Sequence, residues 1–382
     1  MIYLDNAATS FPKPECVYNA IDRCLREYCA NPGRGGHAMS VKAGMAVVYA
    51  RDTLCSLFGI KDTMRLCFTK NATEALNLAI KGIAKQGCNV ITTAMEHNSV
   101  MRPLRTLERD ISIELTVIKG NSIGEIDPSS IKNEIKSNTA LIVCTLSSNV
   151  NGVIMPVREI GKIAREAGIY FLLDASQGAG SMDIDVEEDC IDMMAFPGHK
   201  GLMGPQGTGC LYVREGIPIR PLMEGGTGSN SEYQYQPEIM PDFLESGTLN
   251  TPGIVGLGQG ARCVAEVGVS NIQAYKHALI KLLFDGLQDI NGIIIYSVND
   301  INRNSGIMAI NLAGLDSTEL SYILDHNYGI ACRAGLHCAP SAHSVLGTLT
   351  RGIVRLSVGC MNTRDEILST IKAIEEVSVK YS

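Results

Sequence analysis

The sequence predicts an α/β fold in which a mostly parallel sheet is covered by helices on both faces. Apolar, strand-like segments alternate with helix-like segments from about residue 60 to 215, and such alternation is typical of parallel sheets. The strand-like segments are almost continuously apolar, as expected of strands that are buried on both faces. Past Gly253 the pattern changes to long helical stretches and shorter strands, which indicates a smaller α+β part at the C-terminal end.

The individual elements follow from local patterns. Asn71 as N-cap with Glu74 three positions later is a helix-start signal, and the apolar residues that follow recur at helical spacing. Further helices are expected at 157–166, 256–267, 272–287 and 363–380. Strands of the main sheet are expected at 66–69, 89–93, 113–117, 140–144, 169–173, 191–196 and 210–213, and strands of the C-terminal part at 294–296 and 307–312.

Length and composition narrow the class of protein. At 382 residues the chain is long enough for two domains. We expect an N-terminal arm (1–15) that joins the small domain, a large cofactor-binding domain (16–255) and a small C-terminal domain (256–382) that carries a cysteine loop. The net charge of −7 gives no reason to expect nucleic acid or an anionic membrane as a partner.

Cysteine usage and the absence of targeting signals predict a location. The first residues lack the basic and apolar regions of a secretory signal, and no apolar stretch approaches the roughly 20 residues that span a bilayer. Thirteen cysteines are scattered without C-x-x-C spacing, which favours neither a disulfide scaffold nor a zinc site. We therefore expect a reduced, cytoplasmic protein without a metal, in which most cysteines serve as small buried hydrophobes.

A lysine and a carboxylate stand at the ends of two expected strands. Asp174 ends the run 169–173, with Gln177 three residues later, and Lys200 follows the run 191–196 after a short turn. Ligands of such sheets bind at the carboxyl ends of the strands. A lysine that forms a Schiff base and an aspartate that keeps the pyridine nitrogen protonated are what pyridoxal 5'-phosphate requires. Taken alone, Lys200 would be interpreted as a surface lysine. Because Asp174 and Gln177 are expected beside it, we interpret Lys200 as the lysine that forms the Schiff base.

Two further features suit the same cofactor. The helix start at Ala72 and Thr73 offers backbone N–H groups, a hydroxyl and the positive end of the helix dipole to a phosphate, although it could be only a capping box. His199 could donate another hydrogen bond to that phosphate. His97 follows the strand 89–93 and is a candidate catalytic residue, because it could stack on the pyridine ring and still exchange a proton with substrate, although a loop histidine is usually just solvated.

The C-terminal part contains a candidate nucleophile. Cys338 lies in a Gly/Ala/Pro-flanked loop near Arg333 and His337, and cationic neighbours favour the thiolate form of cysteine. Arg355, in a short strand-like run, could hold a substrate carboxylate with two parallel hydrogen bonds. The common alternatives are an inert buried cysteine and a surface arginine.

Taken together, these motifs resemble the cysteine desulfurases of the class V aminotransferase family, which are fold-type I pyridoxal-phosphate enzymes. The resemblance extends over essentially the whole chain, because the motifs occur in family order from end to end. The form Arg-x-Gly-x-x-Cys resembles the subgroup of selenocysteine lyases. The matching segments are 3–9, 31–37, 71–74, 95–98, 148–152, 174–177, 198–200, 247–251, 333–338 and 355–357.

The resemblance implies a homodimer that converts L-cysteine to L-alanine and passes sulfur from a persulfide on Cys338 to an acceptor protein. Lys200 would bind the cofactor covalently and move the Cα proton. Around the cofactor ring, the implied contacts are Asp174 on the pyridine nitrogen, Gln177 on the phenolate oxygen and His97 on the ring face. The phosphate would be bound by Ala72, Thr73, His199 and a second subunit's Thr248. The substrate carboxylate would be bound by Asn149 and Arg355, and Arg34, His37 and Arg333 would lie near the substrate entrance.

Two departures and three rival functions stay open at this point. Pro197 stands where the family often has a serine that binds the phosphate, and Leu336 replaces a histidine common in the catalytic loop. The nearest rival is a selenocysteine lyase that uses the same residues. An aminotransferase or epimerase of the same fold would not need Cys338, and a catalytically silent scaffold would typically have lost Lys200 or Cys338.

Overall fold

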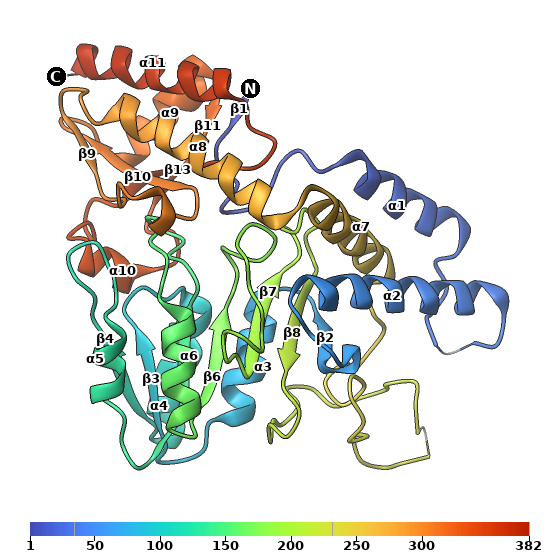
Figure 1. Ribbon diagram of the computed structural model, residues 1–382. Coiled ribbons are helices and arrows are strands. Elements are labelled where there is room, and N and C mark those ends of the chain that lie inside the picture. Colours follow the sequence, from blue (N-terminus) through green and yellow to red (C-terminus); the bar gives the residue numbers. More distant parts are fainter. Residues whose placement is uncertain (34, 231, 382) are drawn as a thin grey trace.

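The computed structural model describes residues 1–33, 35–230 and 232–381. Its centre is a seven-stranded sheet with the strand order β2-β8-β7-β6-β5-β3-β4 (Figure 1). The strands are β2 (Leu66–Thr69), β3 (Asn89–Thr93), β4 (Glu114–Ile118), β5 (Thr139–Thr145), β6 (Tyr170–Asp174), β7 (Met193–Pro197) and β8 (Gly209–Val213). Each expected strand of the main sheet is present, with ends shifted by at most two residues.

The sheet is parallel except at β8, which runs antiparallel to both β7 and β2. The segment 198–208 between β7 and β8 contains no helix. Parallel neighbours need a crossover of about a dozen or more residues, usually a helix, so β8 returns antiparallel. This connection holds Lys200 beside the end of β7.

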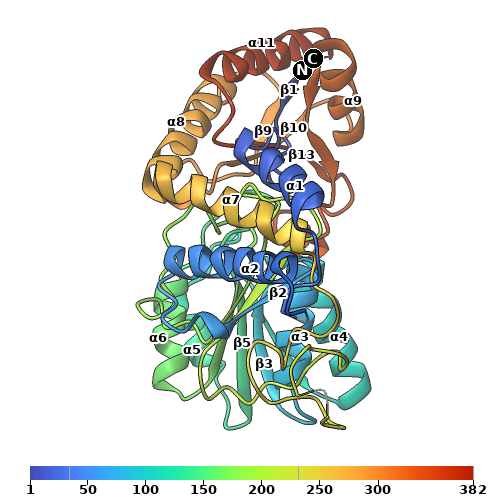
Figure 2. The same cartoon turned by 90° about the vertical axis from the view of Figure 1, so that its right-hand side faces the viewer.

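Helices cover both faces of the sheet. Successive residues of a strand point to opposite faces, so each buried strand packs against both layers of helices. In β7, Met193 and Ala195 face the helices α3 (Ala72–Ile83) and α4 (Asn98–Ile111). Met194 and Phe196 face the opposite layer. That layer contains α2 (Ala38–Leu57), α5 (Pro128–Asn133), α6 (Val157–Glu166) and α7 (Thr251–Val267), and it is seen edge-on in Figure 2.

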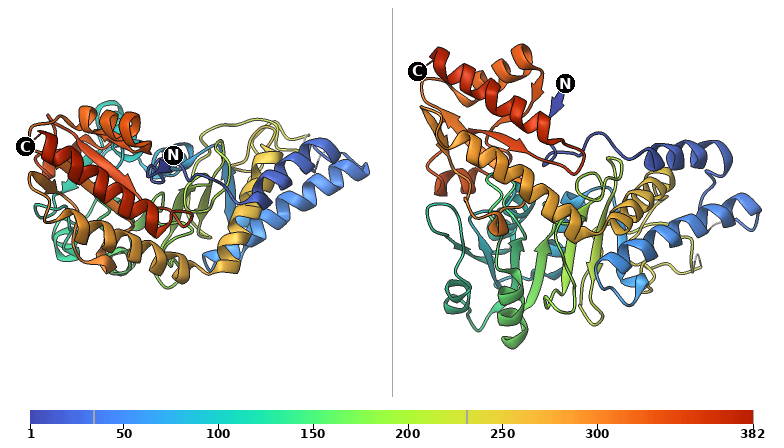
Figure 3. Two further views of the ribbon diagram at one scale, coloured as in Figure 1. Left: turned by 90° about the horizontal axis from the view of Figure 1, so that it is seen from above. Right: turned by 45° about the horizontal axis from the view of Figure 1, so that its top comes forward.

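The C-terminal part forms a second, antiparallel sheet with the order β12-β13-β10-β9. Its strands are β9 (Ile293–Ile295), β10 (Ile307–Leu312), β12 (Arg333–Gly335) and β13 (Ile353–Ser357). Helices α8 (Val269–Leu287), α9 (Ser317–Tyr328) and α11 (Arg364–Tyr381) share one hydrophobic cluster with it (Figure 3). The remaining helices are α1 (Glu15–Glu27) and the short α10 (Pro340–Val345).

The N-terminal strand joins this C-terminal part. β1 (Ile2–Tyr3) pairs in parallel with β11 (Ile330–Ala331), and both chain ends lie at the same end of the molecule in Figure 2. The expected boundary at residues 255 and 256 falls inside the continuous helix α7, which begins at Thr251 behind the N-cap Asn250. The division into domains stays a prediction. No helix within the described ranges is both long and apolar enough to cross a membrane.

All thirteen cysteines are free thiols, but they are less uniformly buried than expected. The buried ones are Cys24, Cys55, Cys67, Cys144 and Cys210. Burial raises the pKa of Cys55 to about 12, so a thiol of this kind stays protonated and inert. Cys338, in contrast, is exposed.

Candidate active site

Asp174 and Lys200 face the same cavity at the carboxyl end of the main sheet. Asp174 is the last residue of β6, Lys200 follows β7, and both residues line one cavity. Gln177 lines the same cavity, and its Nε2 donates to the carbonyl of Ala7 at 3.1 Å. The two strand ends thus present a carboxylate and an amine to one space.

The environment of Lys200 makes its amine easier to deprotonate than that of an ordinary lysine. Burial lowers the pKa of Lys200 to about 8, while the negative charge of Asp174 opposes that shift. The Asp174 side chain is buried, and its Oδ1 accepts a hydrogen bond from the backbone N–H of Ser176 at 2.9 Å. An amine that can lose its proton near neutral pH can act both as a nucleophile and as a base.

The start of α3 forms one end of the cavity. Asn71 caps the helix by accepting from the N–H of Glu74 at 2.9 Å, and Ala72 and Thr73 line the cavity. The Thr73 hydroxyl is 2.7 Å from that of Ser99, a residue that the sequence analysis did not single out. First-turn N–H groups and two hydroxyls together form an environment suited to a phosphate.

His199 adds an unfilled hydrogen-bonding position to this end. Its Nδ1 is buried and has no partner among the described residues, although His199 lines the cavity. Burial and the neighbouring charge of Lys200 lower the pKa of His199 to about 4, so the ring is neutral at neutral pH. A neutral imidazole can still donate one hydrogen bond to an anion.

His97 lines the cavity as the N-cap of α4. Its Nδ1 accepts from the backbone N–H of Ser99 at 3.0 Å and lies 2.8 Å from the Ser99 hydroxyl. Burial lowers the pKa of His97. The ring is therefore fixed by the start of a helix rather than solvated in a loop.

Arg355 is the largest fully buried side chain of the site, and it connects three segments. Its Nη2 pairs with Asp5 Oδ1 at 2.6 Å, and its Nη1 donates to the carbonyl of Asn149 at 2.9 Å. Its Nε is buried without a partner in the described part of the chain. Asn149 in turn donates from Nδ2 to the carbonyl of His337 at 2.7 Å. Asp5 lies in a motif for which the sequence analysis gave no role, so this ion pair was missed.

Cys338 lies in a groove that adjoins the cavity rather than in the cavity itself. The groove shares Thr73, His97 and Ser99 with the cavity. His337 and Cys338 have left-handed backbone φ angles of 50° and 57°. The carbonyl of Cys338 accepts from the N–H of Asn98 at 2.7 Å, which ties the cysteine loop to the start of α4.

The charge near Cys338 comes from Arg333 and not from His337. Arg333 lines the cavity, and its Nη2 is 4.0 Å from Cys338 Sγ. His337 is buried, and burial lowers its pKa to about 3. The expectation that His337 favours the thiolate by its charge is therefore wrong, because the ring is neutral at neutral pH.

Two expected site residues, Thr248 and His37, do not line the cavity within one chain. Thr248 is exposed and lines a separate cavity beside Asn250. His37 is exposed and caps α2 by accepting from the N–H of Ser40 at 3.3 Å. Arg34 lies outside the described residues.

The residues present fit pyridoxal 5'-phosphate. A helix start and the unpartnered His199 Nδ1 form an anion site at one end of the cavity. A buried carboxylate and a buried amine stand at the other positions that the cofactor requires. The unpartnered Arg355 Nε leaves a hydrogen bond for a substrate.

A buried carboxyl group next to this site was also missed. Glu96 is fully buried, and its Oε1 accepts from the Thr93 hydroxyl at 2.7 Å and from the N–H of Thr145 at 3.0 Å. Oε2 has no partner among the described residues. Burial, with a smaller contribution from Asp174, raises the pKa of Glu96 to about 8. The group is therefore a neutral acid over most of the physiological range.

This shift predicts a specific pH dependence of stability. Glu96 keeps its proton up to about pH 8 when folded but loses it near pH 4.5 when unfolded. Folding thus takes up a proton between these values, and stability falls as pH rises through this range. Relative to Glu96→Gln, the free energy of unfolding of the wild type should fall by up to about 1.4 kcal/mol per pH unit. Urea denaturation of the wild type and of Glu96→Gln at a series of pH values measures this difference in the free energy of unfolding. The control is the exposed Glu266→Gln, for which the difference from the wild type should not change with pH. A difference that does not change with pH for Glu96→Gln would contradict the assignment.

Comparisons with known proteins agree with this geometry. The chain matches the model of the Aminotransferase class-V family over residues 2–369. It is 35% identical to a probable cysteine desulfurase of Methanothermobacter thermautotrophicus, with 99% of this chain and 94% of that protein covered. A probable cysteine desulfurase of Pyrococcus abyssi is 32% identical over 99% of this chain and 94% of its own length.

A solved structure shows the same fold. The apo structure of a cysteine desulfurase from Thermococcus onnurineus NA1 superposes with a TM-score of 0.94 at 33% identity, and the match covers 99% of this chain and 95% of that one. The family match extends over nearly all of the chain and includes each segment that lines the cavity. The chain belongs to the class V aminotransferase family.

Proposed function

We propose that this protein is a pyridoxal-phosphate-dependent cysteine desulfurase that releases L-alanine from L-cysteine and keeps the sulfur as a persulfide on Cys338. The observation that carries the proposal is the shared cavity of Asp174, Lys200 and Arg355 with Cys338 in the adjoining groove. The full-length relatives that carry the name cysteine desulfurase support it. When bound, the cofactor supplies an electron sink for the carbanion at Cα of an amino acid.

The chain's own residues hold that cofactor in fixed places. Asp174 provides a buried negative charge for the pyridine nitrogen, and Gln177 provides an amide for the phenolate oxygen. The start of α3, with Thr73 and His199, receives the phosphate. Pro197 lines the cavity and has no hydroxyl, so the phosphate depends on these other donors.

Arg355 and Asn149 position the substrate. Arg355 is held by Asp5 and by the carbonyl of Asn149, so its guanidinium is already oriented before substrate arrives. A guanidinium fixed in this way binds a carboxylate with little loss of side-chain entropy. Its burial in a low-dielectric site makes the ion pair with the substrate stronger than it would be in water.

Lys200 and Cys338 carry the proton transfer and the sulfur transfer. The lowered pKa of Lys200 lets its neutral amine remove the proton from Cα of the substrate. Cys338, with the Arg333 guanidinium 4.0 Å from its sulfur, attacks the substrate sulfur; an S–S bond forms as the C–S bond breaks. The carbon fragment leaves as L-alanine after Cβ takes up one proton and Lys200 returns to Cα the proton that it removed. The exposure of Cys338 leaves the persulfide accessible to an acceptor protein.

A direct assay tests the proposed function. Purified holoenzyme with L-cysteine and a thiol reductant should release L-alanine and sulfide in equal amounts, since each C–S bond broken yields one of each. L-Selenocysteine in a parallel reaction measures the preference between sulfur and selenium by kcat/KM. Pyruvate or transaminated product in place of L-alanine would contradict the proposal and favour another activity of this fold.

We also infer a homodimer in which Thr248 of one subunit contacts the phosphate bound by the other. Thr248 is exposed and remote from its own chain's cavity, which agrees with a role across a subunit boundary. Lys200→Ala should be inactive, and Thr248→Ala should bind the cofactor several-fold more weakly, since a hydrogen bond to a charged group contributes about 1.5–3 kcal/mol.

Mixed dimers of these two variants test the arrangement. One of the two sites would then combine an intact Lys200 with an intact Thr248, so activity at limiting cofactor should exceed that of either variant alone. The exposed neighbour Asn250 is less suitable as a control because it caps α7. Thr53→Ala is the better choice, because Thr53 is a half-buried threonine of α2 whose hydroxyl donates to the carbonyl of Tyr49 in its own helix. If mixing restores nothing, Thr248 acts within its own chain.

A further inference from the structure

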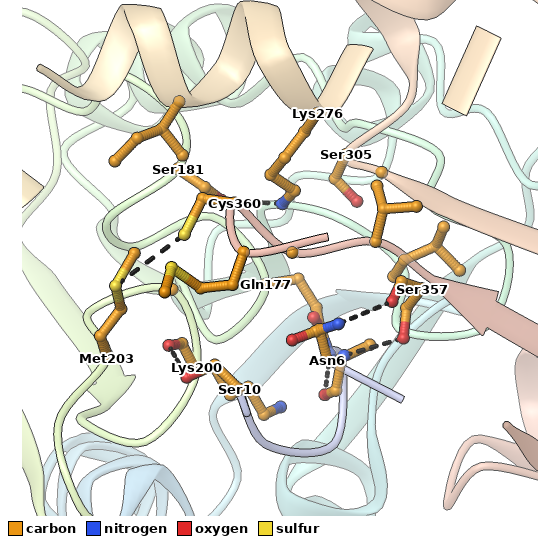
Figure 4. A pocket seen from close by; sticks show the side chains of 18 of the residues that line it. Asn6, Ser10, Gln177, Ser181, Lys200, Met203, Lys276, Ser305, Ser357 and Cys360 are labelled. Carbon is orange, nitrogen blue, oxygen red and sulfur yellow. Dashed lines mark hydrogen bonds between the residues drawn. The ribbon is translucent and has the colours of Figure 1, made fainter. Parts of the chain in front are cut away.

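A second cavity lies beside the cofactor cavity (Figure 4). It is lined by residues of α8, of the segments before β10 and after β13, of the loops that follow β6 and β7, and of the N-terminal segment. Ala7, Gln177 and Lys200 line both cavities. The mechanism proposed above leaves the rest of this second cavity without a role.

Its only lining cation besides Lys200, among the described residues, is Lys276 of α8. In Figure 4 the amine of Lys276 points into the cavity, and it donates to the Ser181 hydroxyl at 3.2 Å. No aspartate or glutamate occurs among the described residues that line the cavity. A charge enclosed by protein without a counter-ion is costly. Burial accordingly lowers the pKa of Lys276 to about 8, yet the amine stays largely protonated at pH 7.

The backbone leaves room for this amine. Gly306 has a φ of 97°, and a Cβ at that position would lie 2.7 Å from Cε of Lys276. A side chain there would therefore displace the lysine. The positive φ favours glycine, and the absence of a side chain at Gly306 leaves space for the end of the Lys276 side chain.

The remaining lining combines hydroxyl groups with an apolar wall. Ser181 and Ser305 lie on the same side as Lys276 in Figure 4. The apolar wall consists of Met203, Ile272, Ile307, Val358 and Met361. One cation with hydroxyl groups fits a single negative head group, and the apolar wall fits a short hydrocarbon tail.

We propose that this second cavity binds a small monocarboxylate anion, with its carboxylate on Lys276 and Ser181 and its aliphatic end against the apolar wall. An amino acid fits less well, because its ammonium group would face Lys276 and no carboxylate among the described lining residues. A dianion would carry more negative charge than Lys276 balances. The occupant would lie next to Lys200 and Gln177, so its binding should be sensed at the cofactor.

Fluorine NMR of the holoenzyme with 3,3,3-trifluoropropionate tests the proposal. The fluorine signal should shift or broaden with the wild type, and Lys276→Met should weaken binding at least about tenfold, the effect of losing a buried charge partner. Lys281→Met, on the same helix but exposed and paired with Asp285, should bind as the wild type does. Propionate should perturb the visible absorbance of the cofactor in the wild type and not in Lys276→Met.

Two outcomes would overturn the proposal. Binding that survives Lys276→Met but is lost in Arg355→Lys would place the carboxylate in the cofactor cavity instead. Equal binding of the neutral analogue 3,3,3-trifluoropropionamide would show that the charge of Lys276 is not used; this comparison needs only the wild type, so it holds even if Lys276→Met does not fold. Neither readout depends on desulfurase activity, so the two proposals can fail separately.

Discussion

Replacement of Cys338 by alanine is expected to lower sulfide release from L-cysteine by about 10³-fold or more, because the reaction loses its positioned nucleophile. The side chain is exposed and lies in the groove that adjoins the cavity, not in the cavity itself. Its removal should therefore leave the cofactor bound. The visible absorbance of the holoenzyme should match that of the wild type, while sulfide and alanine assays show the loss.

The chain offers a matched control for this variant. Cys29 is also exposed but lies just beyond α1, away from the cavity, so Cys29→Ala should keep full activity. Mass spectrometry after one turnover should find one added sulfur atom on Cys338 in the wild type and none in Cys338→Ala. Undiminished sulfide release by Cys338→Ala would remove the nucleophile from the mechanism and favour an aminotransferase or epimerase.

Arg333 should contribute to the same step through the charge it places 4.0 Å from the Cys338 sulfur. The sequence places both Arg333 and His337 near the cysteine, but only the fold decides which of them is charged. His337 is enclosed and stacks on His343 with ring centroids 5.8 Å apart, and this enclosure makes it neutral. Burial depends on contacts made by distant segments, so a local pattern of residue types could not predict it.

The fold itself was more accessible from the sequence. Nearly continuous apolar runs in β5, β6 and β7 predict buried parallel strands, because a strand covered on both faces has no polar side. The helix start at Asn71 and the strand ends at Asp174 and Lys200 are local features, and parallel strand ends meet at one edge of a sheet. The family match agrees with the architecture that these features predict.

Pairings between remote segments were not accessible in the same way. The buried Arg355 and the partly buried Asp5 form an ion pair although they are separated by almost the whole chain. Lys276 stands on an amphipathic helix, where a lysine normally indicates the solvated face, and only the packing of α8 against the loops after β6 and β7 encloses it. Glu96 adjoins the expected site residue His97, but its neutral state follows from tertiary burial alone.

Replacement of Asp174 by asparagine is expected to lower kcat/KM by on the order of 10³-fold, at least as much as loss of a well-placed hydrogen bond in an active site. Asparagine keeps nearly the same shape and can still accept a hydrogen bond, so the variant removes mainly the negative charge. Without that charge the pyridine nitrogen of the cofactor should lose its proton. Nitrogen NMR of ¹⁵N-labelled cofactor in the holoenzyme reports this protonation directly and independently of turnover.

The conservative variant Asp174→Glu separates charge from geometry. It keeps the carboxylate but moves it by one methylene, and a displacement of about 1 Å can cost about 10²-fold. The nitrogen should therefore stay protonated in Asp174→Glu although its activity falls, whereas Asp174→Asn should lose both. A protonated nitrogen in Asp174→Asn would mean that another acid holds that proton in place, and the neutral carboxyl group of Glu96, which senses the charge of Asp174, would then be the residue to replace next.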